Sequence, residues 1–134
     1  MTPTDAQTLL DEMFAPWVRA LDIRVDAIGD TGATLSIPVT DEIARVGGIV
    51  SGQALAALAD TAMVFAVAGH FDGFKPVATT NLDTVFLRPG SGERISCHAE
   101  VVRAGRAVLF ARAMMRALPS EKDVATATAT YMIP

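Results

Sequence analysis

Hydrophobic positions recur at helical spacing near the start of this chain and alternate with polar positions through much of the rest. The first pattern predicts an N-terminal helix within residues 1–20, with Thr4 or Asp5 as its N-cap and an interruption at Pro16. Alternation of apolar and polar residues predicts two short strands and then, after a long helix, three or four long ones: 22–28, 33–39, 76–88, 93–103, 106–118 and 122–132.

One segment, residues 51–69, is apolar at almost every position. It reads SGQALAALADTAMVFAVAG and carries a single charged side chain, Asp60. Its length would suit a membrane span, but the central carboxylate, the many alanines and the polar flanks favour a buried helix. A helix that is apolar on all sides must be covered on most of them. The order of elements therefore predicts one α+β domain over 1–134, with an antiparallel sheet curved around this helix.

The composition narrows the class of protein. Hydrophobic residues make up 51% of the 134 and charged residues 19%, which is apolar enough to suggest a surface buried against another subunit. The net charge of −4 does not favour nucleic-acid binding. One cysteine, Cys97, cannot form an internal disulfide, and no signal-peptide pattern opens the chain. We expect a cytoplasmic protein that binds neither membrane nor nucleic acid.

Several short motifs lie within these predicted elements. They are Gly52, ALADTAM at 57–63, TTNLD at 79–83, FLRP at 86–89, VRAGR at 102–106 and VATA at 124–127. With these motifs, residues 20–132 resemble the hotdog-fold acyl-CoA thioesterases of the phenylacetate-pathway type. The resemblance implies a curved antiparallel sheet wrapped around one long helix, and an enzyme that hydrolyses an acyl-CoA thioester without a cofactor.

The resemblance also implies roles for individual residues. Asp60 would act as general base or nucleophile, and the Gly52 amide would bind the oxyanion. Thr79 stands where the family often has a Ser or Thr that helps to hold water, and Thr61 is a further candidate for polar support. The candidate substrate-binding residues, including arginines considered below, are Ser51, Gln53, Thr61, Arg88, Arg103 and Arg106.

The sequence departs from the family pattern at the start of the helix. The family usually has His-Gly-Gly there, and this chain has Ser51-Gly52-Gln53, while Arg45 replaces a frequent Asn. The missing His motivates an alternative function, a non-catalytic protein that binds or senses acyl-CoA. A hotdog dehydratase or hydratase is disfavoured, because it would need a His near Asp60, and His70 and His98 lie in no such motif.

The spacing of Gly52 and Asp60 in the sequence limits how the two residues could act on one substrate. In the first turn of a helix, backbone N–H groups lack intrahelical partners, and at Gly52 no side chain blocks access to one. Ser51 is a good N-cap for that helix. Gly52 and Asp60 are eight residues apart, which places them about 12 Å apart along the axis. Since a reacting carbonyl must contact both groups, two chains must supply them. We therefore expect a homodimer, or a homotetramer built as a dimer of dimers.

Basic side chains are needed at the mouth of such a site, because coenzyme A carries phosphates. Arg88 precedes a Pro-Gly turn, and Arg103 and Arg106 flank another turn. These three arginines are predicted to cluster at strand ends. Lys75 is a weaker candidate, and Arg45 is expected to point to solvent.

Overall fold

The computed structural model describes all residues, 1–134, and contains three helices and six strands. Their bounds are α1 Pro3–Met13, α2 Pro16–Arg19, β1 Arg24–Gly29, β2 Gly32–Pro38, α3 Gly52–His70, β3 Ala78–Phe86, β4 Arg94–Ala104, β5 Val108–Leu118 and β6 Asp123–Met132. The predicted elements are confirmed in kind and order, with ends that shift by up to two residues. The predicted interruption of the N-terminal helix at Pro16 is also confirmed, because α1 ends at Met13 and α2 begins at Pro16.

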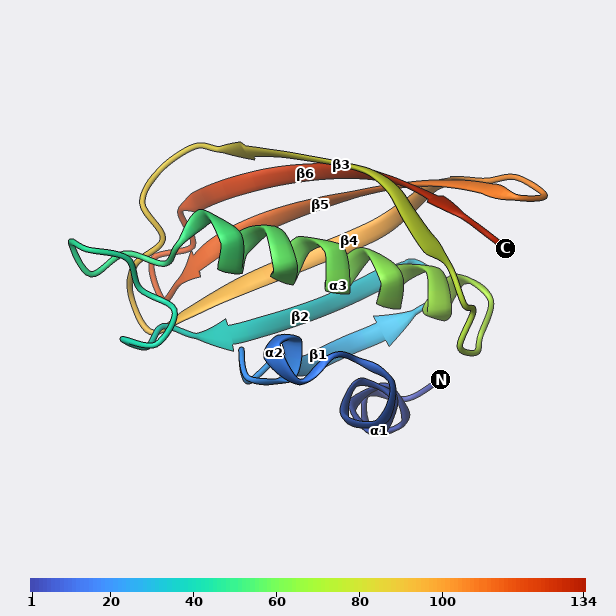
Figure 1. Cartoon of the computed structure of the whole chain (residues 1–134), viewed down its shortest axis with the longest axis horizontal. Coiled ribbons are helices and arrows are strands. Elements are labelled where there is room, and N and C mark those ends of the chain that lie inside the picture. The colour runs from blue at the N-terminus through green and yellow to red at the C-terminus, as the bar shows by residue number, and fades with distance from the viewer.

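All six strands form one antiparallel sheet in the order β1-β2-β4-β5-β6-β3. The sheet curves along α3 (Figure 1). The predicted α+β architecture is therefore confirmed. The strand that follows α3 in sequence, β3, lies at the edge of the sheet beside the last strand, β6. This crossover brings residues near 80 next to residues near 130.

Small side chains allow α3 to lie close to the sheet. The inward face of β6 carries Ala125, Ala127, Ala129 and Tyr131, all of them buried. Five alanines of α3 are buried as well, and 67% of the most apolar window of the helix is buried within the fold. α3 is long and apolar enough to cross a membrane, but this burial is what a core helix shows.

The N-terminal helix begins earlier than predicted. Thr2, rather than Thr4 or Asp5, is its N-cap, and Asp5 instead completes a capping box with Thr2. The ring of Phe14, just after α1, stacks on Phe65 of α3 with centroids 5.4 Å apart. This contact places the end of α1 against the second half of α3.

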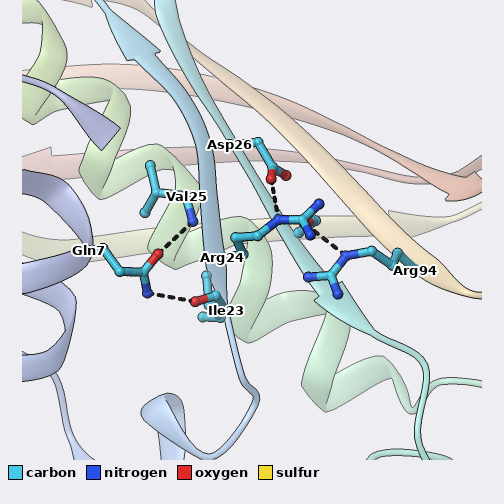
Figure 2. A network of polar contacts seen from close by, with 7 residues as sticks. Gln7, Ile23, Arg24, Val25, Asp26 and Arg94 are labelled. Atoms are coloured by element: carbon cyan, nitrogen blue, oxygen red, sulfur yellow. Dashed lines mark hydrogen bonds and ion pairs between the residues drawn. The ribbon is translucent and has the colours of Figure 1, made fainter. Parts of the chain in front are cut away.

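The two edges of the sheet differ. At the β1 edge, the Gln7 amide of α1 donates to the Ile23 carbonyl and accepts from the Val25 N–H, each at 2.9 Å (Figure 2). Between the neighbouring strands β2 and β4, the Arg94 guanidinium donates to the Ser36 hydroxyl at 3.1 Å. At the other edge, β3 pairs with β6 alone, and its second row of backbone groups has no partner in the chain. Such an open edge can pair with another strand.

Candidate active site

Asp60 is half-buried in the middle of α3 and faces β3 and β6. The Thr79 hydroxyl donates to its carboxylate, 3.1 Å from Oδ1 and 3.4 Å from Oδ2. The Tyr131 hydroxyl lies 2.7 Å from Oδ1 and 3.2 Å from the Asp60 backbone carbonyl oxygen. Both hydroxyl groups thus donate to Oδ1 at short range, whereas Oδ2 accepts only the longer contact from Thr79 and is the less engaged oxygen.

Tyr131 is the residue of this site that the sequence analysis missed. It is fully buried, and burial together with the adjacent Asp60 carboxylate raises the pKa of its phenol. The phenol therefore keeps its proton at ordinary pH and donates it to Asp60. A signal was present, because Tyr131 is the only tyrosine and continues the alanine face of its strand.

Replacing Tyr131 with phenylalanine tests the importance of this donor. Removing the hydroxyl leaves the Asp60 carboxylate and backbone carbonyl short of one donor, so the variant should be less stable by about 1–3 kcal/mol. Denaturant-induced unfolding of the variant and of the wild type measures this loss. Equal stability of the two proteins would show that the Tyr131 hydroxyl contributes little to the site.

A pocket of about 380 Å³ opens beside Asp60 and Thr79. We call it the aspartate pocket. It lies between the end of α1, the second half of α3 and the segment that leads into β3. Its remaining lining is apolar except for one lysine: Met13, Phe14, Val64, Phe74, Lys75, Pro76 and Val77. A carboxylate at the wall of an apolar pocket suits an acyl group placed for attack.

A second pocket, of about 340 Å³, lies at the N-terminal end of α3. We call it the glycine pocket. Gly52 is the first residue of α3, its N–H has no hydrogen-bond partner in the chain, and a Cβ there would lie 3.2 Å from the Phe86 ring. The pocket is lined by Arg45, Ile49, Val50, Gly52, Leu55 and residues 86–90. A free helix N-terminal amide, with two arginines nearby, favours bound negative charge.

Ser51 caps α3 as predicted, since its hydroxyl accepts a hydrogen bond from the Ala54 N–H at 3.2 Å. Gln53 is exposed next to Gly52. Thr61 is buried, and its hydroxyl donates to the Ala57 carbonyl one turn earlier at 2.8 Å. The Thr61 hydroxyl is therefore engaged within its own helix, and the structure does not bring it to the Asp60 carboxylate.

The two pockets share no residue, and α3 runs unbroken between Gly52 and Asp60. Within one chain, the Gly52 amide and the Asp60 carboxylate therefore belong to different cavities. This matches the separation of about 12 Å expected from helix geometry.

The predicted cluster of arginines is not found within one chain. Arg88 donates to the Asp123 carbonyl at the start of β6, while Arg103 and Arg106 flank the β4–β5 turn. β4 pairs with β5 from Arg94 opposite Leu118 to Ala104 opposite Leu109, so these arginines lie at opposite ends of the sheet. The three arginines do not meet within one chain, because successive turns of an antiparallel sheet alternate between its two ends. Arg45 is exposed, as expected, and also lines the glycine pocket.

Other chemistry-bearing side chains lie outside both pockets. Burial raises the pKa of the Cys97 thiol to about 12, which makes it a poor nucleophile. His98 bonds the Thr34 hydroxyl through Nδ1 at 2.9 Å, and His70 packs edge-on against Phe71. No three His, Cys, Asp or Glu side chains converge to hold a metal ion.

The sequence model of the thioesterase superfamily matches residues 47–123, which is more than half of the chain. The chain belongs to the thioesterase superfamily. The matched region contains Gly52, Asp60 and Thr79, and it ends before Tyr131. As a member of this superfamily, the protein belongs to a class whose general activity is the hydrolysis of thioesters or esters.

Individual relatives agree with this assignment. A protein of Thermoplasma acidophilum described as a candidate esterase is 24% identical over 94 residues, which is 70% of each chain. A candidate thioesterase from Silicibacter sp. TM1040 is 28% identical with a TM-score of 0.87, and the match covers all of this chain and 92% of that one. A thioesterase family protein from Silicibacter pomeroyi is 25% identical with a TM-score of 0.82, covering 95% and 93%.

Proposed function

We propose that this superfamily member is a cytoplasmic acyl-CoA thioesterase of the phenylacetate-pathway type that acts as a homodimer or a dimer of dimers. The observation that carries the proposal is Asp60, an acidic side chain held by two hydroxyl donors at the wall of an otherwise mostly apolar pocket. A thioester carbonyl placed there would lie beside a positioned carboxylate.

In the proposed reaction, Oδ2 of Asp60, which has the weaker hydrogen bonding, is the oxygen that reacts. As general base it takes a proton from water, whose oxygen attacks the thioester carbonyl carbon. As nucleophile it attacks that carbon itself, and water then hydrolyses the resulting anhydride. In both routes the carbonyl oxygen becomes negative, the C–S bond breaks, and the sulfur of coenzyme A leaves with the electron pair. The proton lost by the attacking water passes to this sulfur, and the products are a free acid and coenzyme A.

Gly52 of the partner subunit would stabilise the negative oxygen. The open edge of β3, with Val85, Phe86 and Leu87 about half exposed, supports a dimer in which two β3 strands pair antiparallel. Such pairing sets the start of one β3 against the end of the other. It therefore points the glycine pocket of one chain toward the aspartate pocket of the next, as the two-chain argument requires.

The same dimer would reunite the arginines. The start of β3 lies at the sheet end that carries the β4–β5 turn, because Ala78 and Val108 both pair with Met132. Antiparallel pairing of the two edges would bring Arg103 and Arg106 of one chain to the end where Arg88 of the partner subunit lies. We propose that these three arginines together bind the phosphates of coenzyme A at the mouth of the site.

A hydrolysis screen over aryl, short-chain and medium-chain acyl-CoAs, followed by thiol release, tests the proposal. Turnover of at least one class, lost on substitution of Asp60, is the expected result. A thermal shift with coenzyme A and no turnover across the panel would favour the second candidate function, a protein that only binds acyl-CoA. The specific observation behind that candidate is the Ser51-Gly52-Gln53 start of α3, which lacks a histidine.

A further inference from the structure

The open edge of β3 (Figure 1) carries two polar side chains that face the same way. Asn81 and Asp83 are exposed on the outer face of the sheet. Leu82, between them, pairs with the buried Ala129 and therefore points to the inner face, toward α3. Asp83 belongs to none of the four ion pairs of the chain. The edge thus presents an amide and an unpaired carboxylate, two residues apart, to any strand that lies beside it.

A second copy of the chain can add its own β3 to this edge in only a few registers. The two inner faces must lie on the same side of the joined sheet, because each is covered by its own α3. Residues directly opposite each other in an antiparallel pair have side chains on the same face, so a two-fold pairing is centred on a residue that lies opposite its own copy. Along the ladder with β6, whose register shifts between Thr79 and Asn81, centres at Leu82 or Asp83 leave the fewest residues of β3 unpaired.

Charge distinguishes these two registers. A pairing centred on Asp83 would set the two Asp83 carboxylates directly opposite each other, where like charges destabilise a strand pair. A pairing centred on Leu82 instead sets each Asp83 opposite Asn81 of the partner subunit, whose amide N–H groups can donate to the carboxylate. The two Leu82 side chains then meet on the inner face. The register centred on Leu82 is therefore favoured on both faces of the sheet.

The same register brings the two pockets together. At one end of β3, Phe86 lies so close to Gly52 that a Cβ there would be 3.2 Å from the ring. At the other end, Thr79 bonds Asp60 at 3.1 Å. Counted along the ladder with β6, pairing about Leu82 sets Phe86 beside Val77 of the partner subunit. Phe86 lines the glycine pocket and Val77 lines the aspartate pocket, so the glycine pocket of one chain adjoins the aspartate pocket of the other.

We infer that two copies of β3 pair antiparallel about Leu82, and that Asp83 holds this register by accepting a hydrogen bond from Asn81 of the partner subunit. The inference rests on the proposed function, because it specifies the dimer in which the Gly52 amide of one chain reaches Asp60 of the other. Moving the centre by one residue shifts each strand by two residues, about 7 Å, against its partner. Such a shift would separate the oxyanion donor from the thioester.

Cysteine cross-linking reads the register directly. A residue opposite its own copy has Cα atoms about 4.5–5.5 Å apart, which a disulfide can span, whereas a shift of two residues increases the distance to about 8 Å. Under mild oxidation, Leu82→Cys should therefore form a linked dimer at least about tenfold faster than Thr84→Cys. A 1:1 mixture of the two variants should form few mixed dimers, because a link between positions 82 and 84 marks the register centred on Asp83. The native Cys97 is buried, so the wild type should not link.

A pair of exposed positions provides the same measurement if the inner variants fold poorly. Ala78 and Val85 are exposed and lie opposite each other across the two chains in the inferred register. Ala78→Cys and Val85→Cys should each stay unlinked alone and should link when mixed, as mass spectrometry of the joined peptides would show. Faster linking at a combination that marks another register, or no linking in either set, would overturn the inference.

The role of Asp83 is tested by Asp83→Asn. Without the two carboxylates, the register centred on residue 83 is no longer disfavoured by repulsion. The mixed dimer of Leu82→Cys and Thr84→Cys should then increase by about threefold or more in this background. Asp30→Asn removes the same charge from the exposed β1–β2 turn and should leave the mixed dimer at its low level. An unchanged level in Asp83→Asn would contradict the role inferred for Asp83.

The links report strand pairing and not catalysis, so the inference and the proposed function can fail separately. The expected links in a protein that hydrolyses no thioester would leave the inference standing and end the proposed function. Turnover in a protein whose links mark another register would do the reverse. In an active protein, the oxidised Leu82→Cys dimer should keep most of the turnover of its reduced form, because the link joins the chains in their native register. A loss of turnover on oxidation would contradict that register.

Discussion

Replacing Asp60 with asparagine is expected to lower kcat for acyl-CoA hydrolysis by about 10²- to 10⁴-fold, because the amide can neither accept a proton from water nor attack the thioester. Asparagine keeps the shape of the side chain, and its carbonyl oxygen can still accept the Tyr131 hydrogen bond of 2.7 Å. Steady-state thiol release measures the loss, and size-exclusion chromatography and thermal unfolding check that the assembly is retained.

Asp30→Asn is the matched control for this variant. Asp30 is an exposed aspartate in the β1–β2 turn that lines neither pocket, and its substitution removes the same unit of charge. Its kcat should equal that of the wild type. Near wild-type turnover in the Asp60→Asn variant would end the proposal that Asp60 acts in the reaction.

Replacing Gly52 with proline is expected to lower kcat by about 10²- to 10³-fold, as the loss of one oxyanion donor does. Proline has no N–H, and it is well accepted at the first position of a helix. The preceding residue, Ser51, already has the extended backbone, ψ 149°, that a following proline requires. The variant therefore removes the proposed donor while leaving the helix start in place.

Gly52→Ala separates the lost N–H from the added side chain. Both variants place a Cβ near the Phe86 ring, where the contact of 3.2 Å requires a small movement, but alanine retains the donor. Gly52→Ala should keep most of the activity that Gly52→Pro loses. Equal losses in the two variants would assign the effect to crowding and would remove Gly52 from the mechanism.

Mixing the two inactive variants examines whether one site is built from two chains. A mixed dimer of Asp60→Asn and Gly52→Pro contains one site with both native groups and one site with neither. If subunits exchange randomly in a 1:1 mixture, about half of the dimers are mixed and about a quarter of wild-type activity should return. Recovery to that level supports a shared site, whereas two variants that stay inactive after verified exchange would contradict it.

Local pattern was sufficient to predict the elements of this fold. The apolar side chains of residues 51–69 can leave water only if the helix that carries them is covered. The alternating pattern of the last strands allows only one face of each strand to be buried. The 1.5 Å rise of a helix also separates Gly52 from Asp60 whatever the fold around them, so the prediction that two chains share one site follows from spacing. Family membership confirms the class of activity that the motifs indicate.

The side chains that surround Asp60 could be identified only from the tertiary structure. Tyr131 is 71 residues from Asp60, and the two meet only because β3 crosses to the far edge of the sheet and β6 lies beside it. Strand order and register are set by long-range packing, which no local window of sequence contains. The same is true of the lining of the aspartate pocket and of the arginines at opposite ends of the sheet. The sequence by itself determined which residues could do the chemistry; the tertiary structure decided which neighbours hold them.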